Sequence, residues 1–103
     1  MSVLVNFAMF PTDAGISISK PVSGIIELIK NSGVPYVLGP MGTSIETETM
    51  PEALEIINKA YALLEKDHDR VYANITMDVR RGDVGRMKSK IQSIENKIGK
   101  VNT

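Results

Sequence analysis

The chain contains no cysteine and a single histidine, and each scarcity removes a class of function. Without cysteine there can be no disulfide, no thiol nucleophile and no thiolate ligand for a metal. His68 lies between Asp67 and Asp69 in a polar stretch, where we expect it to be solvated. Neither a glycine-rich phosphate loop nor the ligand spacing of a metal cage occurs. We therefore expect no enzyme activity and no cofactor.

An excess of charge of one sign is also missing. Twelve basic and twelve acidic residues balance, so nothing indicates a nucleic acid or an anionic membrane as partner. The first ten residues lack the basic region of a signal peptide, and no apolar run reaches transmembrane length. We expect a cytoplasmic protein. With 103 residues, 43% of them hydrophobic, the chain is expected to form a single domain over 1–103.

Hydrophobic periodicity predicts seven elements in the order β-α-β-β-α-β-α. Strands alternate apolar and polar residues, whereas helices repeat apolar residues three and four positions apart. The expected strands are 3–10, 36–38, 43–47 and 70–80, and the expected helices are 19–32, 49–66 and 84–98.

Several residues mark the expected helix ends. Ser19 is suited to cap the first helix, and Gly33 to end it in a left-handed conformation. Thr49 and Glu52 form a capping box for the second helix. Asp83 is expected to cap the third.

Two β-α-β halves of this kind predict an α+β fold, the ferredoxin-like sandwich. It has a four-stranded antiparallel sheet with two helices on one face, and here an extra C-terminal helix follows. The first and last strands would be neighbours, with Asn6 and Ala8 beside Asn74, Thr76 and Asp78 on the face without helices. This mixed face suggests a wet subunit interface or a small polar pocket.

The segment Gly39-Pro40-Met41-Gly42 predicts a tight turn between two short strands. Its glycines are expected to adopt backbone angles that other residues avoid, with a positive φ expected at Gly42. A glycine-relaxed turn also lets a ligand approach the backbone closely.

Four segments occur in an order that resembles a known family: Ile16-Ser17-Ile18-Ser19-Lys20, Ser32-Gly33 ahead of Tyr36, Pro40-Met41-Gly42-Thr43 with Ile45-Glu46, and Arg70-Val71 leading to Asp78-Val79-Arg80. The chain resembles the small thiamine-binding family related to YkoF. One difference is Thr47, which stands where many relatives carry glycine.

The resemblance implies a ferredoxin-like fold, dimers or tetramers, and non-catalytic binding of thiamine or its hydroxymethylpyrimidine moiety near a subunit interface. Carboxylates suit both the amine of the pyrimidine and the cationic thiazolium. Hydroxyls can bind the pyrimidine, and methionine or Tyr36 can pack on the rings. The candidate ligand-binding residues are Ser17, Ser19, Met41, Gly42, Thr43, Glu46, Asn74 and Asp78.

Each candidate has a structural alternative. Glu46 can be a solvated strand residue, Asp78 can pair with Arg80 or Arg81, and Tyr36 can belong to the core. The chain as a whole also has an alternative function, an oligomeric regulatory or scaffolding module that holds no vitamin. The last helix favours self-association as a homodimer or homotetramer, because it carries a narrow apolar stripe of Met87, Ile91, Ile94 and Ile98.

Overall fold

β1 (Ser2–Pro11) is one of the two inner strands of the sheet. Its alternating sequence directs one set of side chains into the core, and Val3, Val5, Phe7 and Met9 are all buried. The computed structural model describes all residues from 1 to 103. No helix in it has the length and apolar character needed to cross a bilayer.

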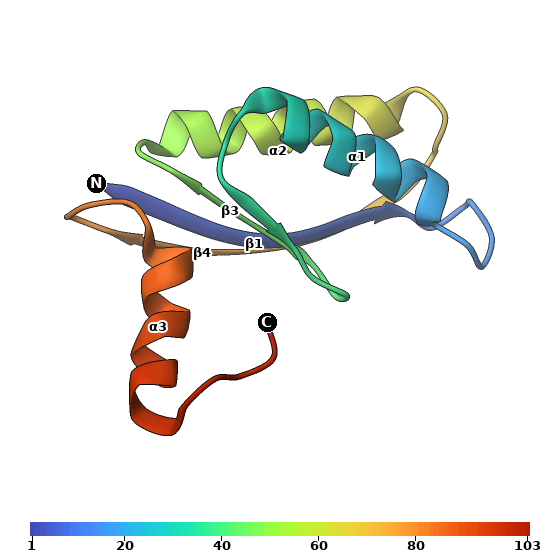
Figure 1. Ribbon diagram of the computed structural model, residues 1–103. Coiled ribbons are helices and arrows are strands. Elements are labelled where there is room, and N and C mark those ends of the chain that lie inside the picture. Colours follow the sequence, from blue (N-terminus) through green and yellow to red (C-terminus); the bar gives the residue numbers. More distant parts are fainter.

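Four antiparallel strands form the sheet, in the order β2-β3-β1-β4. The other three are β2 (Tyr36–Leu38), β3 (Thr43–Thr47) and β4 (Val71–Arg80). Helices α1 (Ser19–Ser32) and α2 (Met50–Glu65) cover one face (Figure 1). This is the ferredoxin-like arrangement, so the predicted fold class is confirmed.

The core lies between the two helices and the sheet. Apolar side chains of α1 and α2 spaced three and four residues apart meet the inward residues of β1 and β3. The buried hydrophobic residues are Val3, Val5, Phe7, Met9, Ile25, Ile29, Ile45, Ala53, Ile56, Ala60 and Leu64. Tyr36 packs against this cluster, as its structural alternative predicted.

The helix ends follow the sequence signals in part. Thr49 accepts from the backbone N–H of Glu52, so the predicted cap is confirmed; the Glu52 carboxylate accepts from the Thr49 hydroxyl and not from its backbone N–H, so the capping box is formed only in part. Gly33 ends α1 with φ 82°, as expected. Ser19 is not a cap, because it is already the first residue of α1 and Ile18 holds the cap position without a side-chain hydrogen bond.

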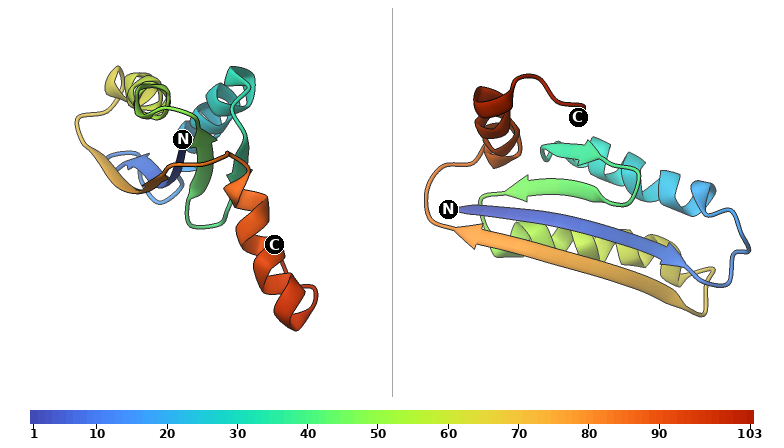
Figure 2. Two further views of the ribbon diagram at one scale, coloured as in Figure 1. Left: turned by 90° about the vertical axis from the view of Figure 1, so that its left-hand side faces the viewer. Right: turned by 90° about the horizontal axis from the view of Figure 1, so that it is seen from below.

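The third helix, α3 (Arg86–Ile98), lies on the opposite side of the sheet from α1 and α2 (Figure 1). It starts two residues later than predicted, because Gly85 takes the cap position with φ 100° in place of Asp83. Near its start the helix packs beside β1 and β3, and Arg86 and Lys90 reach Asp78 of β4; beyond that it projects away from the body (Figure 2). Its apolar stripe is largely uncovered, with Ile94 48% exposed and Ile98 73% exposed.

The face of the sheet without α1 and α2 has the predicted register. Asn6 lies opposite Thr76, and Ala8 lies opposite Asn74. On the same face, the Asn6 amide donates to Ser44 Oγ at 3.0 Å and Phe10 packs on Tyr72 with 5.6 Å between ring centroids. Asn6, Ser44 and Thr76 therefore have hydrogen-bond partners within the chain.

Candidate functional site

A cleft of about 280 Å³ lies between α1 and the turn that joins β2 to β3. The second half of β1 forms its floor, the first turns of α1 form one wall, and the turn forms the other. Most of its lining is apolar, and no ionisable side chain takes part. The lining residues are Phe7, Ala8, Met9, Phe10, Ile18, Val22, Ile25, Ile26, Leu38, Gly39, Pro40, Met41, Gly42 and Thr43.

The turn is closely packed against β1. The N–H of Gly39 donates to Gly42 O at 2.9 Å, and a Cβ on Gly39 would lie 2.8 Å from that oxygen. A Cβ on Gly42 would lie 2.8 Å from Asn6 Oδ1 and 3.2 Å from Phe7 O. Gly42 is not among the residues with positive φ, so that expectation was wrong. At Gly39 the close backbone oxygen requires glycine, whereas a side chain at Gly42 would displace the Asn6 amide and crowd the backbone of Phe7.

Three predicted site residues line this cleft, and two more are sequence neighbours of a lining residue. Met41, Gly42 and Thr43 belong to its lining, with Met41 89% exposed at the rim and Thr43 buried. Ser17 and Ser19 flank Ile18, a lining residue, and their hydroxyl oxygens lie 3.3 Å apart. The cleft therefore has apolar walls with one hydroxyl residue, Thr43, in its lining and two serines next to the lining residue Ile18; small-molecule sites are likewise mostly apolar with a few polar groups.

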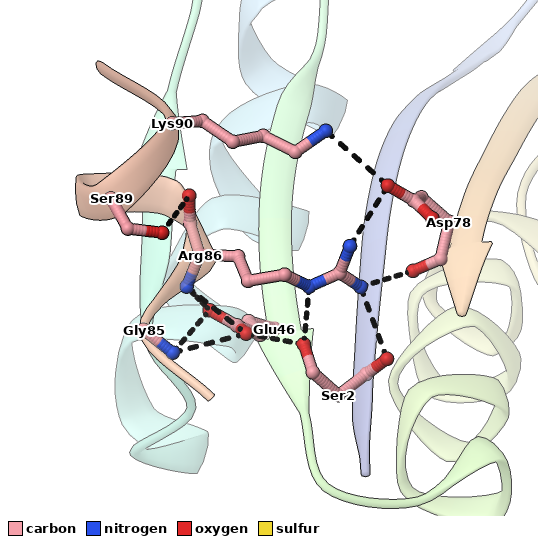
Figure 3. Close-up of polar contacts among 7 residues, drawn as sticks. All are labelled: Ser2, Glu46, Asp78, Gly85, Arg86, Ser89 and Lys90. Carbon is pink, nitrogen blue, oxygen red and sulfur yellow. Dashed lines mark hydrogen bonds and ion pairs between the residues drawn. The ribbon is translucent and has the colours of Figure 1, made fainter. Parts of the chain in front are cut away.

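Glu46 occupies a different place, at the root of α3 (Figure 3). Its side chain points to the face without α1 and α2, where its carboxylate accepts hydrogen bonds from the hydroxyl of Ser2 and from the backbone N–H groups of Gly85 and Arg86. Only 3% of the residue is exposed, so it is not the solvated strand residue of the structural alternative. Burial raises the pKa of Glu46, but the bonds from Ser2, Arg86 and Gly85 outweigh burial and leave the pKa below its usual value.

Arg86 is buried beside it, 2% exposed, and joins three elements. Its Nε donates to Ser2 Oγ at 2.9 Å, and its Nη1 donates to Asp78 Oδ2 at 2.8 Å (Figure 3). Lys90 reaches the same oxygen at 3.3 Å. Asp78 thus pairs with neither Arg80 nor Arg81, and the bonds from Lys90 and Arg86 lower its pKa. We call Ser2, Glu46, Asp78 and Arg86 the α3 clasp.

The remaining polar candidates lie outside both places. Asn74 is exposed on the helix-free face of β4, opposite Ala8. His68 is not freely solvated, because its Nδ1 lies 2.8 Å from Asp13 Oδ1 and only 20% of its side chain is exposed. Asp13 also accepts from the N–H of Asp69, so it fastens the loop before β4. Histidine and carboxylate side chains form no group of three suited to a metal ion.

The sequence comparison identifies the family. A family described as thiamine-binding protein matches residues 5–95. The chain belongs to the thiamine-binding protein family. A UPF0045 protein from Methanothermobacter thermautotrophicus is 34% identical over 83 residues, which cover 80% of this chain and 84% of the relative. Another, from Mycobacterium bovis, is 32% identical over 95 residues and covers 92% and 93% of the two chains.

Solved structures agree with this membership. A hypothetical protein from Methanocaldococcus jannaschii superposes with a TM-score of 0.80 at 27% identity, over 90% of this chain and 95% of that one. A candidate thiamine biosynthesis or salvage protein from Thermotoga maritima superposes with a TM-score of 0.78 over 91% and 99% of the two chains. At 21% identity, the second comparison supports the fold alone.

Sequence reasoning missed two groups of residues in this family member. The α1 residues Val22 and Ile26 have the spacing of a core stripe, yet both also line the cleft. Arg86 was overlooked because it is one of twelve basic residues. Only its position at the start of an otherwise mixed helix, soon after Asp83-Val84-Gly85, distinguishes it in the sequence.

Proposed function

We propose that this protein binds thiamine, or its hydroxymethylpyrimidine moiety, in the cleft between α1 and the β2–β3 turn, and that it does not transform the ligand. The observation that carries the proposal is the convergence of Met41, Gly42 and Thr43 with the Ser17–Ser19 segment around one apolar cleft. Family membership supports the same ligand class.

The chemistry of the lining favours the pyrimidine half of the ligand. A cleft of about 280 Å³ is at the lower end for small-molecule sites and suits a single substituted ring. An uncharged aminopyrimidine can lie between Met41 and the aromatic Phe7 while hydroxyls and backbone groups bind its nitrogens. The cationic thiazolium has no carboxylate in the lining, so we place it at the open rim, in contact with water.

Two features support a binding role over catalysis. The carboxylates of Glu46 and Asp78 are bonded to donors of the α3 clasp and so are not available as a general base. His68 is held by Asp13, and neither residue lines the cleft.

A pair of matched variants tests the site. Val22→Phe places a ring in the cleft, whereas Val37→Phe makes the same change at a 54% exposed residue of β2 that does not line it. By isothermal titration calorimetry, we expect wild type and Val37→Phe to bind thiamine or hydroxymethylpyrimidine with equal affinity. Val22→Phe should bind roughly tenfold more weakly or worse, the equivalent of about 1.4 kcal/mol.

As a control, circular dichroism should show that Val22→Phe and Val37→Phe are both folded. Equal affinity in the two variants would remove the cleft as the site. Absence of binding by the wild type to either compound would overturn the proposal and leave the alternative of an assembly module without a vitamin.

A further inference from the structure

β1 runs past the end of β3, so part of its edge has no neighbouring strand (Figure 2). The ladder between the two strands ends at Phe7 opposite Thr43, whereas β1 continues to Pro11. The next position in this ladder would be Met41, which belongs to the turn and pairs with no residue of β1. The last four residues of β1 therefore have β4 as their single neighbour in the sheet.

The hydrogen bonds of the flanking ladders show which backbone groups face this open edge. In an antiparallel ladder, alternate residues direct both N–H and C=O to the same neighbour. The N–H of Thr12 donates to Arg70 O at 3.0 Å, so the even-numbered residues of β1 bond to β4 and the odd-numbered ones face β3. In β3, the N–H of Glu46 donates to Pro35 O at 3.2 Å, on the side of β2. This leaves the odd-numbered residues of β3 to bond to β1, as the register between the two strands requires.

Met9 is the one residue of β1 that directs both a free N–H and a free C=O to this edge. Its odd-numbered neighbours differ, because Phe7 is paired with β3 and Pro11 has no N–H. Neither the N–H nor the C=O of Met9 has a hydrogen-bond partner in the chain. Only 6% of Met9 is exposed, and unpaired backbone groups cost free energy when buried. A ligand that supplied both bonds would therefore be favoured at this place.

These two backbone groups lie on the floor of the cleft. Four consecutive residues of β1, 7–10, line the cleft, although alternate side chains of a strand point to opposite faces of the sheet. A cleft that touches both sets runs along the edge of the strand, where Met9 directs its N–H and C=O. The lining around this edge contains no charged side chain.

We propose that the N–H and C=O of Met9 bind the aminopyrimidine ring as a donor–acceptor pair and select it against its 4-oxo analogue. This inference rests on the proposed function, because it takes hydroxymethylpyrimidine as the ligand. In that compound the ring nitrogen N3 is an acceptor and the neighbouring 4-amino group is a donor. The N–H of Met9 donates to N3 while its C=O accepts from the amino group, since both groups of an extended residue point the same way.

The nearby hydroxyls would not give this selectivity. A serine or threonine hydroxyl can rotate to donate or to accept, so Ser17, Ser19 or Thr43 would tolerate an exchange of donor and acceptor on the ring. The N–H and C=O of Met9 have fixed roles. The 4-oxo analogue in its lactam form directs an N–H at the N–H of Met9 and a C=O at its C=O, so both hydrogen bonds are lost.

Calorimetry with the two compounds tests the selectivity, because they have nearly the same size and shape. We expect the 4-oxo analogue to bind roughly a hundredfold more weakly than hydroxymethylpyrimidine, or worse, since two hydrogen bonds are lost and the Met9 groups stay unpaired. Equal affinities would overturn the inference and leave the binding proposal standing. If neither compound binds, both the inference and the proposed function are refuted.

Amide hydrogen exchange, measured by NMR, tests whether Met9 makes the contact. Without ligand its N–H should exchange faster than that of Phe7, which is bonded to β3, and hydroxymethylpyrimidine should slow it roughly tenfold or more. Tyr36 is the matched control, because by the same alternation its N–H faces the free edge of β2, outside the cleft. Its exchange rate should not change. Binding of the compound without slower exchange at Met9 would refute the inference, with the proposed function intact.

Discussion

The hydrogen bonds of the Glu46 carboxylate come from residues far from it in the sequence. Its carboxylate accepts a hydrogen bond from Ser2, 44 residues earlier, and another from the amide of Arg86, 40 residues later. From the sequence, Glu46 was predicted to bind the ligand or to be a solvated strand residue; its actual donors could not be predicted, because both are brought there by the fold. This geometry argues for a structural role of Glu46, and its role in ligand binding stays a prediction.

The first prediction concerns the α3 clasp. Glu46→Gln keeps the shape of the side chain but removes the charge and turns an N–H₂ group toward the donors of Gly85 and Arg86. Hydrogen bonds to a charged group contribute about 1.5–3 kcal/mol, so we expect the free energy of unfolding to fall by about 2 kcal/mol or more. Urea denaturation measures this, with Glu48→Gln at an exposed neighbour as the control.

Thiamine affinity gives the contrast. If the carboxylate only fastens α3, Glu46→Gln should bind thiamine as wild type does. If Glu46→Gln instead keeps its stability but loses thiamine affinity, Glu46 belongs to the ligand site.

The second prediction is the pH dependence of the same bonds. The folded-state pKa of Glu46 lies below its usual value of 4.5, so its stabilising contribution is complete above that value. The contribution is lost as the pH falls through the lower folded-state pKa. We expect the stability gap between wild type and Glu46→Gln to be constant near neutral pH and to narrow below about pH 4.5. A gap that stays the same down to acid unfolding would contradict this.

At the scale of helices and strands, periodicity predicted every element and its order, while several ends differed. Ser19 and Asp83 are good capping residues by type, but Ile18 and Gly85 hold the cap positions. For α3 the reason is local: Gly85 has φ 100° and brings its N–H to Glu46. Because the Gly85 cap position is set by a bond to Glu46 on another element, the residues at the helix end do not by themselves predict where α3 begins.

The third prediction separates two glycines. In Gly42→Ala the new methyl group meets Asn6 Oδ1 and the backbone oxygen of Phe7, so we expect a loss of about 1 kcal/mol or more in the free energy of unfolding. In Gly24→Ala, on an exposed face of α1, the methyl group meets nothing within 4 Å. That variant should be more stable by about 0.5–1 kcal/mol. Thermal or urea unfolding measures both, and equal changes in the two would contradict our account of the turn.

At the scale of the whole molecule, the sequence predicted which residues are buried less well than it predicted the helices and strands. An apolar stripe on α1 looks the same whether it faces the core or lines a cleft, so Val22 and Ile26 were predicted only as helix residues. The alternating pattern of β4 likewise predicts a strand with one buried face, yet every residue after Val71 is exposed. Burial of an edge strand depends on what lies beyond the edge, and the pattern of a single chain does not contain that information.

The fourth prediction concerns the self-association that the apolar stripe of α3 led us to expect. If two copies associate only when folded, mass action makes the melting temperature rise with protein concentration. We expect this rise for wild type in differential scanning calorimetry. A concentration-independent wild-type transition would count against association of the native chain.

The position of β1 has a further consequence for how the protein is made. β1 leaves the ribosome before the other strands of this sheet, and its longest partner, β4, is the last of the four, with Ser2 in register with Arg80. During synthesis β1 therefore lacks its β4 partner along one edge, and Ser2 lacks its hydrogen bond from Arg86, until those residues have been made. Pairing across such a long separation is slow, and an unpaired apolar strand is prone to aggregation. β1 is thus the strand most accessible to chaperones until β4 and Arg86 have been synthesised and bond to it.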